Sequence, residues 1–182
     1  MIETERLILR QWKESDFEPF IKMGLDQDVM QFFPSLLTPQ ESLNLIQKIS
    51  LLIDENGWGF WAVELKESHQ FIGFIGLHNQ PEQFDFSPCV EIGWRLAKEF
   101  WKQGYATEGA KAVLDYAFNV LNLDKIVSFT ATLNKPSQAV MERIGMQKVK
   151  NFDHPKVPLH HELRAHFLYE ISCERNTYSS KS

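Results

Sequence analysis

The sequence predicts an α+β fold in which a mixed β-sheet carries helices on both faces. Strand-like segments rich in β-branched and aromatic residues alternate with segments whose apolar residues recur at helical spacing. Cys89–Leu96 and Lys125–Thr132 flank one such helix, so they form a βαβ unit with parallel strands and a right-handed crossover. The preceding strands, Gly59–Lys66 and Gln70–Leu77, are joined by a short polar turn and form an antiparallel hairpin. The sheet therefore contains both kinds of strand pair.

The first elements are a strand and two helices. Arg6–Trp12 has the composition of a strand, and apolar residues every three or four positions predict a helix at Ser15–Leu25. The second helix has a clear start, because Thr38 precedes a proline and Glu41 completes a capping box. Gly57 ends this helix.

The C-terminal half follows the same two periodicities. Its further elements are expected as a helix with an apolar face from Ala106 to Leu121, a helix at Lys135–Ile144 that stops at Gly145, and strands at Gln147–Phe152 and Ala165–Cys173. Residues 1–173 are expected to form a single domain, and the polar residues 174–182 a frayed tail.

Composition narrows the class of protein. With 43% hydrophobic and 24% charged residues, the chain resembles globular proteins, and its net charge of −5 argues against nucleic-acid binding. Neither a secretory signal nor a run of about 20 apolar residues is visible, so a cytoplasmic protein without a membrane partner is expected. Cys89 and Cys173 lie in apolar strand-like segments and are expected to be buried free thiols.

The most informative segment is the loop at residues 101–105, which joins a strand to the N-terminus of an amphipathic helix. It contains one glycine, Gly104, and leads directly into the helix. The first N–H groups of a helix lack partners within it, and the helix dipole favours negative charge there. This loop therefore predicts a site for a phosphate-bearing cofactor.

Four sequence pieces, in this order and spacing, resemble the GNAT N-acetyltransferase superfamily. They are Glu91-Ile92-Gly93-Trp94, Trp101-Lys102-Gln103-Gly104-Tyr105-Ala106-Thr107-Glu108, Asn134-Lys135-Pro136-Ser137 and Ile144-Gly145-Met146. The branch that contains the ribosomal-protein alanine N-acetyltransferases is the most similar one, and the resemblance covers nearly the whole chain. It implies a GNAT fold with one parallel βαβ unit that binds acetyl-CoA.

The resemblance also implies which residues hold acetyl-CoA. The loop and first helical turn would bind its phosphates, the edge of one strand would pair with the pantetheine amides, and the start of the following helix would hold the pantetheine arm. The residues expected in these roles are Lys102, Gln103, Gly104, Tyr105, Ala106 and Thr107 for the phosphates, Ile92, Trp94 and Leu96 for the strand edge, and Asn134 and Ser137 for the arm.

The chain departs from the family pattern at two positions. Lys102 stands where this branch commonly has glycine, so a positive φ at this residue would strain the backbone, while its ammonium group could compensate near the phosphates. Many members carry a tyrosine general acid at the position of Met141. The expected proton donor to the leaving thiolate is therefore Ser137.

Two residues are the catalytic candidates. Glu91 is the candidate base that deprotonates the acceptor amine, and its alternative role is an ion pair with Arg95, two positions further along the same strand face. Ser137 is the candidate acid, and its alternative role is that of a residue favoured at a helix start.

Four of the six histidines, at positions 154, 160, 161 and 166, lie in one C-terminal stretch. Three roles are open for them: residues of a surface loop, contacts to the acceptor, or pH-sensitive groups. No metal-binding motif accompanies these histidines, so no metal is expected. Phe33 and Trp58 could line the acceptor pocket or belong to the core.

These observations predict an acetyl-CoA-dependent N-acetyltransferase that acts by direct transfer to a primary amine. The acceptor is a protein N-terminus or a small molecule, and the sequence does not identify it. The oligomeric state is expected to be a monomer or a homodimer. The alternative is a catalytically silent regulator that binds acyl-CoA, which the departures at Lys102 and Met141 leave open.

Overall fold

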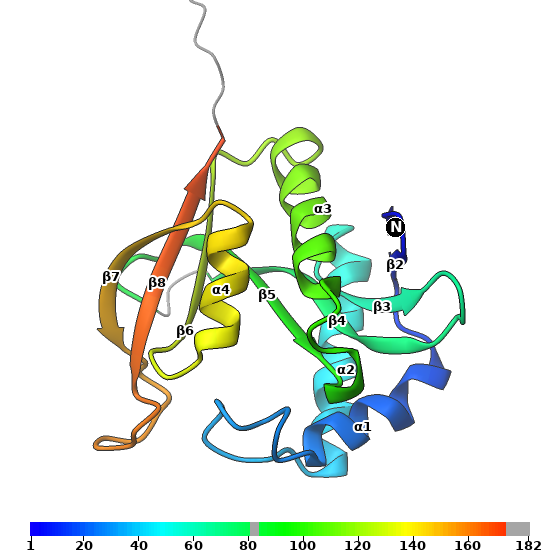
Figure 1. Cartoon of the computed structure of the whole chain (residues 1–182), viewed down its shortest axis with the longest axis horizontal. Coiled ribbons are helices and arrows are strands. Elements are labelled where there is room, and N and C mark those ends of the chain that lie inside the picture. Colours follow the sequence, from blue (N-terminus) through cyan, green and yellow to red (C-terminus); the bar gives the residue numbers. More distant parts are fainter. Residues whose placement is uncertain (81–83, 174–182) are drawn as a thin grey trace, which may run out of the picture.

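The computed structural model describes residues 1–80 and 84–173. They form one eight-stranded mixed sheet with the strand order β1-β2-β3-β4-β5-β6-β8-β7 (Figure 1). The strands are β1 (Ile2–Glu3), β2 (Leu7–Arg10), β3 (Phe60–Leu65), β4 (Phe71–Gln80), β5 (Cys89–Leu96), β6 (Lys125–Ala131), β7 (Gln147–Asp153) and β8 (Ala165–Ser172). The predicted tail at 174–182 lies outside the described residues.

Helices cover both faces of this sheet, as predicted. Helices α1 (Phe17–Leu25) and α2 (Pro39–Asn56) pack on one face, and α3 (Tyr105–Asn119) and α4 (Lys135–Arg143) pack on the other. Alternate residues of β4 show the division, since the Phe74 ring meets Phe20 of α1 whereas the Ile75 side chain meets Gly109 of α3. Below, these faces are called the α1 face and the α3 face.

The sheet opens between β5 and β6, the one parallel pair among the described strands. Strand β5 pairs with β4 over its whole length, from Cys89 to Leu96, but with β6 at a single position, Glu91 opposite Val127. One buried side-chain bond adds to this contact, because Ser128 Oγ donates to the carbonyl of Ile92 at 2.9 Å. Beyond this point the two strands diverge (Figure 1). This gap between β5 and β6 is the feature that positions the site.

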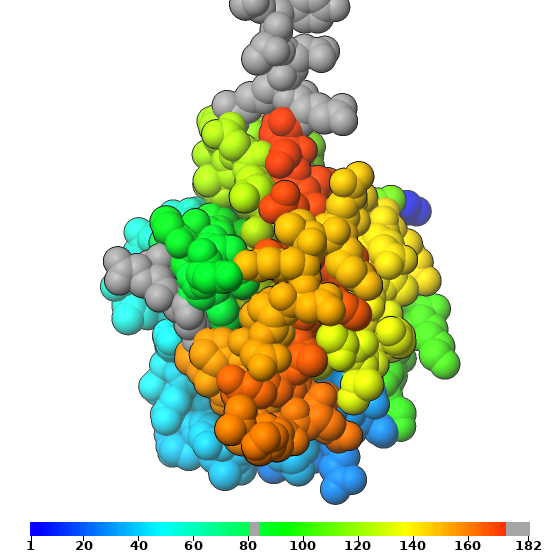
Figure 2. All heavy atoms as spheres, turned by 90° about the vertical axis from the view of Figure 1, so that its left-hand side faces the viewer, coloured from blue at the N-terminus to red at the C-terminus, as the bar shows by residue number. Residues whose placement is uncertain are grey.

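Two connections meet over the α1 face. Phe32, between α1 and α2, packs against Val157 and Leu163 of the β7–β8 connection and against Ala131 at the end of β6. Figure 2 shows this connection, in orange, on the surface beside the light-blue α1–α2 segment. The segments at 26–38 and 154–164 are therefore fixed to one another near the end of the gap.

The predicted elements are confirmed with small differences at their ends. The capping box at Thr38 and the left-handed Gly57 bound α2 as expected. Two features were missed: the short strand β1, and the last three residues of β4, which the sequence placed in a loop but which pair with Val90 and its neighbours in β5. Within the described ranges, none of the helices is both long and apolar enough to cross a membrane.

Candidate active site

The loop before α3 has the left-handed backbone that a tight turn around an anion requires. Gly104 has φ of 82° and Lys102 has φ of 61°. The strain foreseen for Lys102 is therefore present, since a side chain disfavours this conformation. The indole N–H of Trp101 donates to the carbonyl of Leu96 at 2.8 Å and fixes the loop to the end of β5.

The N-terminus of α3 is left open. Its N-cap is Gly104, which has no side chain, and no side chain caps the helix. The N–H of Glu108 bonds to the Gly104 carbonyl, so the free donors of the first turn are those of Tyr105, Ala106 and Thr107. This arrangement suits a phosphate group, because several N–H groups converge at the positive end of the helix dipole.

The chain start holds this turn in place. Arg6 forms an ion pair with Glu108 at 2.6 Å, donates to the carbonyl of Gln103 at 3.0 Å, and its guanidinium lies 4.4 Å from the centre of the Tyr105 ring. Thr4 donates a second bond to Glu108 at 2.6 Å. These contacts could not be predicted from the sequence, since nothing local links residues that are about a hundred positions apart.

The backbone of β5 presents polar groups to the gap. The carbonyls of Ile92 and Leu96 point away from β4, because they accept from Ser128 and Trp101 respectively. Since strand backbone groups alternate in direction, the N–H and C=O of Trp94 point the same way. The side chains of Ile92 and Leu96 are buried on the α3 face. These residues therefore present backbone groups, and not side chains, to the gap.

At the start of α4, Asn134 and Ser137 bond to each other. Asn134 Oδ1 accepts from the backbone N–H of Ser137 at 3.2 Å, and its Nδ2 donates to Ser137 Oγ at 3.1 Å and to Thr130 Oγ1 at 2.9 Å. Asn134 is thus the N-cap, and only one acceptor position of its amide stays free. Met141, at the family's tyrosine position, is buried in the core.

Glu91 lies on the α1 face of β5, partly buried. Its Oε2 accepts a hydrogen bond of 2.8 Å from Gln80 Nε2, and burial raises its pKa to about 7 against the opposing effect of this bond. Its cross-strand neighbour is His78, whose pKa burial lowers. The alternative pairing of Glu91 with Arg95 is wrong, because no ion pair connects them within the described chain.

The histidine-rich stretch splits into two pairs. His154 and His166 enter a cluster of aromatic rings, 4.9 Å apart between ring centres, whereas His160 is exposed and the half-buried His161 accepts from the backbone of Leu163. Burial, and then the neighbouring His166, lower the pKa of His154 to about 4. The other members of the cluster are Phe84, Phe86, Phe129 and Phe152. Among residues 1–80 and 84–173, no group of three potential ligands gathers closely enough to hold a metal.

Both cysteines are free thiols, and both are half-buried rather than fully buried. Burial raises the pKa of Cys89. A thiol held in its protonated form is a poor nucleophile, so this environment does not favour an acyl-cysteine route through Cys89.

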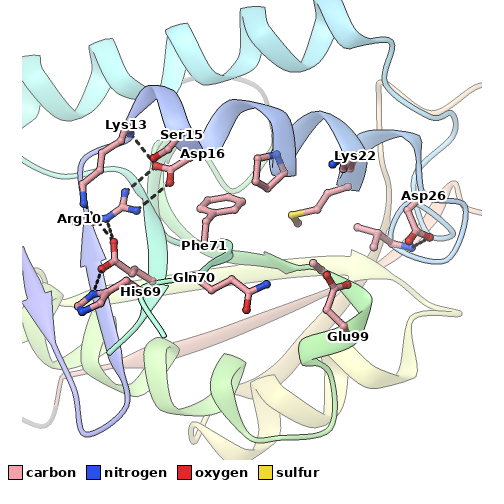
Figure 3. A pocket seen from close by; sticks show the side chains of 15 residues that line it. Arg10, Lys13, Ser15, Asp16, Lys22, Asp26, His69, Gln70, Phe71 and Glu99 are labelled. Carbon is pink, nitrogen blue, oxygen red and sulfur yellow. Dashed lines mark hydrogen bonds and ion pairs between the residues drawn. The ribbon is translucent and has the colours of Figure 1, made fainter. Parts of the chain in front are cut away.

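A pocket of about 520 Å³ lies elsewhere, between α1 and the ends of β2, β3 and β4 (Figure 3). None of the predicted site residues lines it. Arg10 crosses one end as a buried cation, paired with Asp16 at 2.7 Å and with Glu64 at 2.6 Å. Because these three groups neutralise one another and form hydrogen bonds together, their burial is explained by the fold and does not require a ligand.

An open helix N-terminus beside two diverging parallel strands is a site suited to a phosphate-bearing cofactor. The chain matches the family model described as "Acetyltransferase (GNAT) domain" over residues 6–147. The protein therefore belongs to the GNAT acetyltransferase family, and it is an N-acetyltransferase that uses acetyl-CoA.

Its relatives agree with this assignment. The "Uncharacterized N-acetyltransferase YoaA" of Bacillus subtilis is 28% identical over 150 residues, which cover 81% of this chain and 83% of YoaA. The "Uncharacterized protein YkkB" of the same organism is 32% identical over 153 residues, 81% of this chain and 85% of YkkB. The crystal structure of a GNAT acetyltransferase from Bacillus anthracis is 28% identical with a TM-score of 0.79, covering 94% of this chain and 97% of that one.

Proposed function

We propose that this N-acetyltransferase moves the acetyl group directly from acetyl-CoA to a primary amine in a ternary complex. The observation that carries the proposal is the position of Glu91, whose side chain lies on the α1 face at the point where β5 and β6 part. The candidate cofactor-binding groups of the loop, α3 and α4 lie on the α3 side of the sheet. The two substrates would therefore approach the gap from opposite faces.

The phosphates of acetyl-CoA would lie at the free N–H groups of Tyr105, Ala106 and Thr107. Gly104 lets the backbone approach closely, and the exposed Lys102 and Gln103 flank the turn. The backbone groups of Trp94, between those of Ile92 and Leu96, would pair with the pantetheine amides. Asn134 has one free acceptor position for an N–H of the same arm.

Glu91 is the proposed base. An amine attacks only in its neutral form, so a group must take its proton near neutral pH. With a pKa raised to about 7, Glu91 can accept this proton, directly or through one water. The amine nitrogen then forms a bond to the carbonyl carbon and loses its second proton to water, the carbon–sulfur bond breaks, and sulfur leaves with the electron pair.

Ser137 is the proposed donor to the departing sulfur. Its Oγ accepts from Asn134 Nδ2, so this bond leaves its own hydroxyl hydrogen free. That hydrogen can bond to the leaving thiolate and be passed to it, with a water replenishing the hydroxyl. Asn134 orients Ser137 and provides the cap that the sequence analysis had assigned to the serine as its alternative role.

The acceptor is proposed to be a protein N-terminal amine or a small-molecule amine. The motif resemblance to the ribosomal-protein alanine N-acetyltransferases supports the first. The α1 face is closed by the segments at 26–38 and 154–164, which the Phe32 contacts hold together, and these segments would set acceptor choice. A monomer or homodimer in the cytoplasm is proposed.

The test is thiol release from acetyl-CoA across a panel of N-terminal peptides and small amines. Glu91→Gln and Ser137→Ala should each lower kcat/KM by about 100-fold while acetyl-CoA affinity, measured by calorimetry, stays unchanged. Glu55→Gln and Ser68→Ala, at exposed positions, are matched controls with full activity expected. Full activity of both site variants on a true acceptor would refute these two roles. A rise in melting temperature with acetyl-CoA but no thiol release with any amine would instead support the silent regulator.

A further inference from the structure

Among residues 1–80 and 84–173, Arg95 is a cation that lacks a counter-ion. It follows Glu91 and Gly93 along the α1 face of β5 and is the cross-strand partner of Phe74. Its Nε and Nη1 atoms are buried, and neither has a hydrogen-bond partner. Burial alone lowers the pKa of Arg95 to about 10, since no carboxylate lies close enough to oppose the effect of desolvation.

Two phenylalanines hold the guanidinium in place. Its central carbon lies 4.3 Å from the centre of the Phe33 ring and 5.4 Å from that of Phe74. Such contacts offset part of the cost of burying the charge. They leave the N–H groups unsatisfied, because stacking uses the faces of the guanidinium and the donors point outward from its edges.

The fold has paired the buried Arg10 differently. Arg10 is buried with two carboxylates, each within 2.7 Å, and two of its nitrogens bond to Asp16. A buried charge is costly unless it is paired and hydrogen-bonded. Arg95 lacks what Arg10 has, which indicates that its partner is supplied by a molecule the protein binds.

The position of Arg95 indicates which substrate this is. Along the same strand face, Gly93 separates it from Glu91, and the Phe60 ring of β3 packs over this glycine, so Phe60 forms the wall between the proposed base and the guanidinium. Phe33, which covers the guanidinium, belongs to the segment at 26–38 that closes the acceptor side and is itself 42% exposed. The proposed cofactor-binding turn lies on the other face of the sheet.

We propose that Arg95 is a specificity-determining residue that binds a carboxylate carried by the amine acceptor. The planar guanidinium offers its Nε and Nη1 N–H groups to the carboxylate oxygens, while the acceptor amine lies toward Glu91. The acceptor is thus an amino acid derivative, or a peptide with an acidic side chain near its N-terminus. This inference rests on the proposed function, because it takes the α1 face as the acceptor side.

The test uses binding of acetylated products, which needs no turnover. Calorimetry would compare N-acetylglycine, N-acetyl-β-alanine and N-acetyl-γ-aminobutyrate with their primary amides, and an N-acetyl-Ala-Glu peptide amide with its Ala-Gln counterpart. In the wild-type protein with CoA bound, at least one carboxylate should bind about tenfold tighter than its uncharged partner, as a charge-assisted hydrogen bond in a buried site gives. If one of the N-acetylated amino acids shows the preference, the acceptor is a small molecule; if the Ala-Glu peptide shows it, the acceptor is a peptide.

The variants assign the preference to Arg95. Arg95→Met should abolish it, and Arg95→Lys should keep the charge but retain only part of it, since lysine lacks the planar fork. Lys111→Met, at an exposed position of α3, changes the net charge equally and should leave the preference intact. Phe33→Ala, which removes one of the two rings that hold the guanidinium, should weaken the preference.

Two results would overturn the inference: equal or undetectable binding of every carboxylate and its uncharged partner, or a preference that survives in Arg95→Met. Neither depends on thiol release, so a failure of the proposed reaction and a failure of this inference are distinguishable. If Arg95→Met does not fold, the Lys and Phe33 variants decide.

Discussion

Gln80 Nε2 donates a hydrogen bond of 2.8 Å to Oε2 of Glu91, joining the last residue of β4 to the residue at which β5 leaves β6. The bond orients a carboxylate whose pKa burial has raised to about 7. A group that titrates near neutral pH in the folded state gives a prediction about activity and another about stability.

The first prediction concerns the pH dependence of activity. In the wild-type protein, kcat/KM should rise with pH and level off above an apparent pKa of about 7, because only ionised Glu91 accepts a proton. Gln80→Leu removes the bond that favours the ionised form, so the apparent pKa should rise further. A profile that stays the same in Gln80→Leu would argue against Glu91 as the titrating group.

The second prediction concerns stability and follows from linkage. The folded-state pKa of Glu91 lies above its ordinary value of 4.5, so its favourable contribution is complete below pH 4.5 and is lost as the pH rises through about 7. Glu91→Gln should therefore increase the free energy of unfolding above pH 7 by up to about 3 kcal/mol, since one pKa unit is worth about 1.4 kcal/mol. Urea titrations at pH 5 and pH 8 measure this, with Glu55→Gln as the control.

The third prediction concerns Lys102. Its positive φ costs about 1 kcal/mol, which glycine would not incur. Lys102→Gly should stabilise the protein by about that amount, whereas Lys102→Ala keeps the strain and should not. If the ammonium group lies near the cofactor phosphates, both variants should bind acetyl-CoA several-fold more weakly, with a smaller dependence on salt. Equal stability of the Gly and Ala variants would contradict the strain.

The fourth prediction concerns acid. Because burial lowers the pKa of His154 to about 4 from 6.5, its neutral form is favoured in the fold, and stability present above pH 6.5 is lost as the pH falls toward 4. His154→Phe should reduce this loss by about 1–2 kcal/mol, a figure that allows for its partial exposure to solvent. The matched control is His160→Gln at an exposed position, which should leave the loss of stability at acid pH unchanged. Urea titrations between pH 4 and pH 7 measure both variants.

The fifth prediction concerns the buried Arg10 and its two carboxylates beside the pocket of Figure 3. Arg10→Met leaves Asp16 and Glu64 without their cation and should destabilise the fold by about 3–5 kcal/mol. Lys22→Ala removes the exposed ion pair with Glu18 and should have no measurable effect, because solvent screens it. Chemical denaturation of both variants distinguishes the two kinds of pair.

Most of the fold was readable from the sequence, because its boundaries carry local signals. Thr38 and Gly57 bound α2 through capping, and Gly104 marks the start of α3 through its positive φ. The end of β4 was missed, since His78–Gln80 is polar and becomes a strand only through pairing with β5. Tertiary pairing decided what local composition could not.

The site was only partly readable for the same reason. Motif order drew attention to the turn before α3 and to Glu91, Asn134 and Ser137, but it did not show that Gln80 reaches Glu91 or that Asn134 caps α4. It also gave no sign that Arg95, the alternative partner of Glu91, buries its Nε and Nη1 without a hydrogen bond from the described residues. Such facts depend on register and on which segments close over a strand.

The divergence of β5 from β6 gives the sheet two edges in its middle. Strand edges with unpaired backbone groups ordinarily invite pairing with other chains, and proteins protect them. Here helices stand on one face of the opening, and the segments at 26–38 and 154–164 close the other. A strand from a second molecule would meet these helices and segments before it reached the two edges, so the flanking elements protect the protein from aggregation through the middle of its sheet.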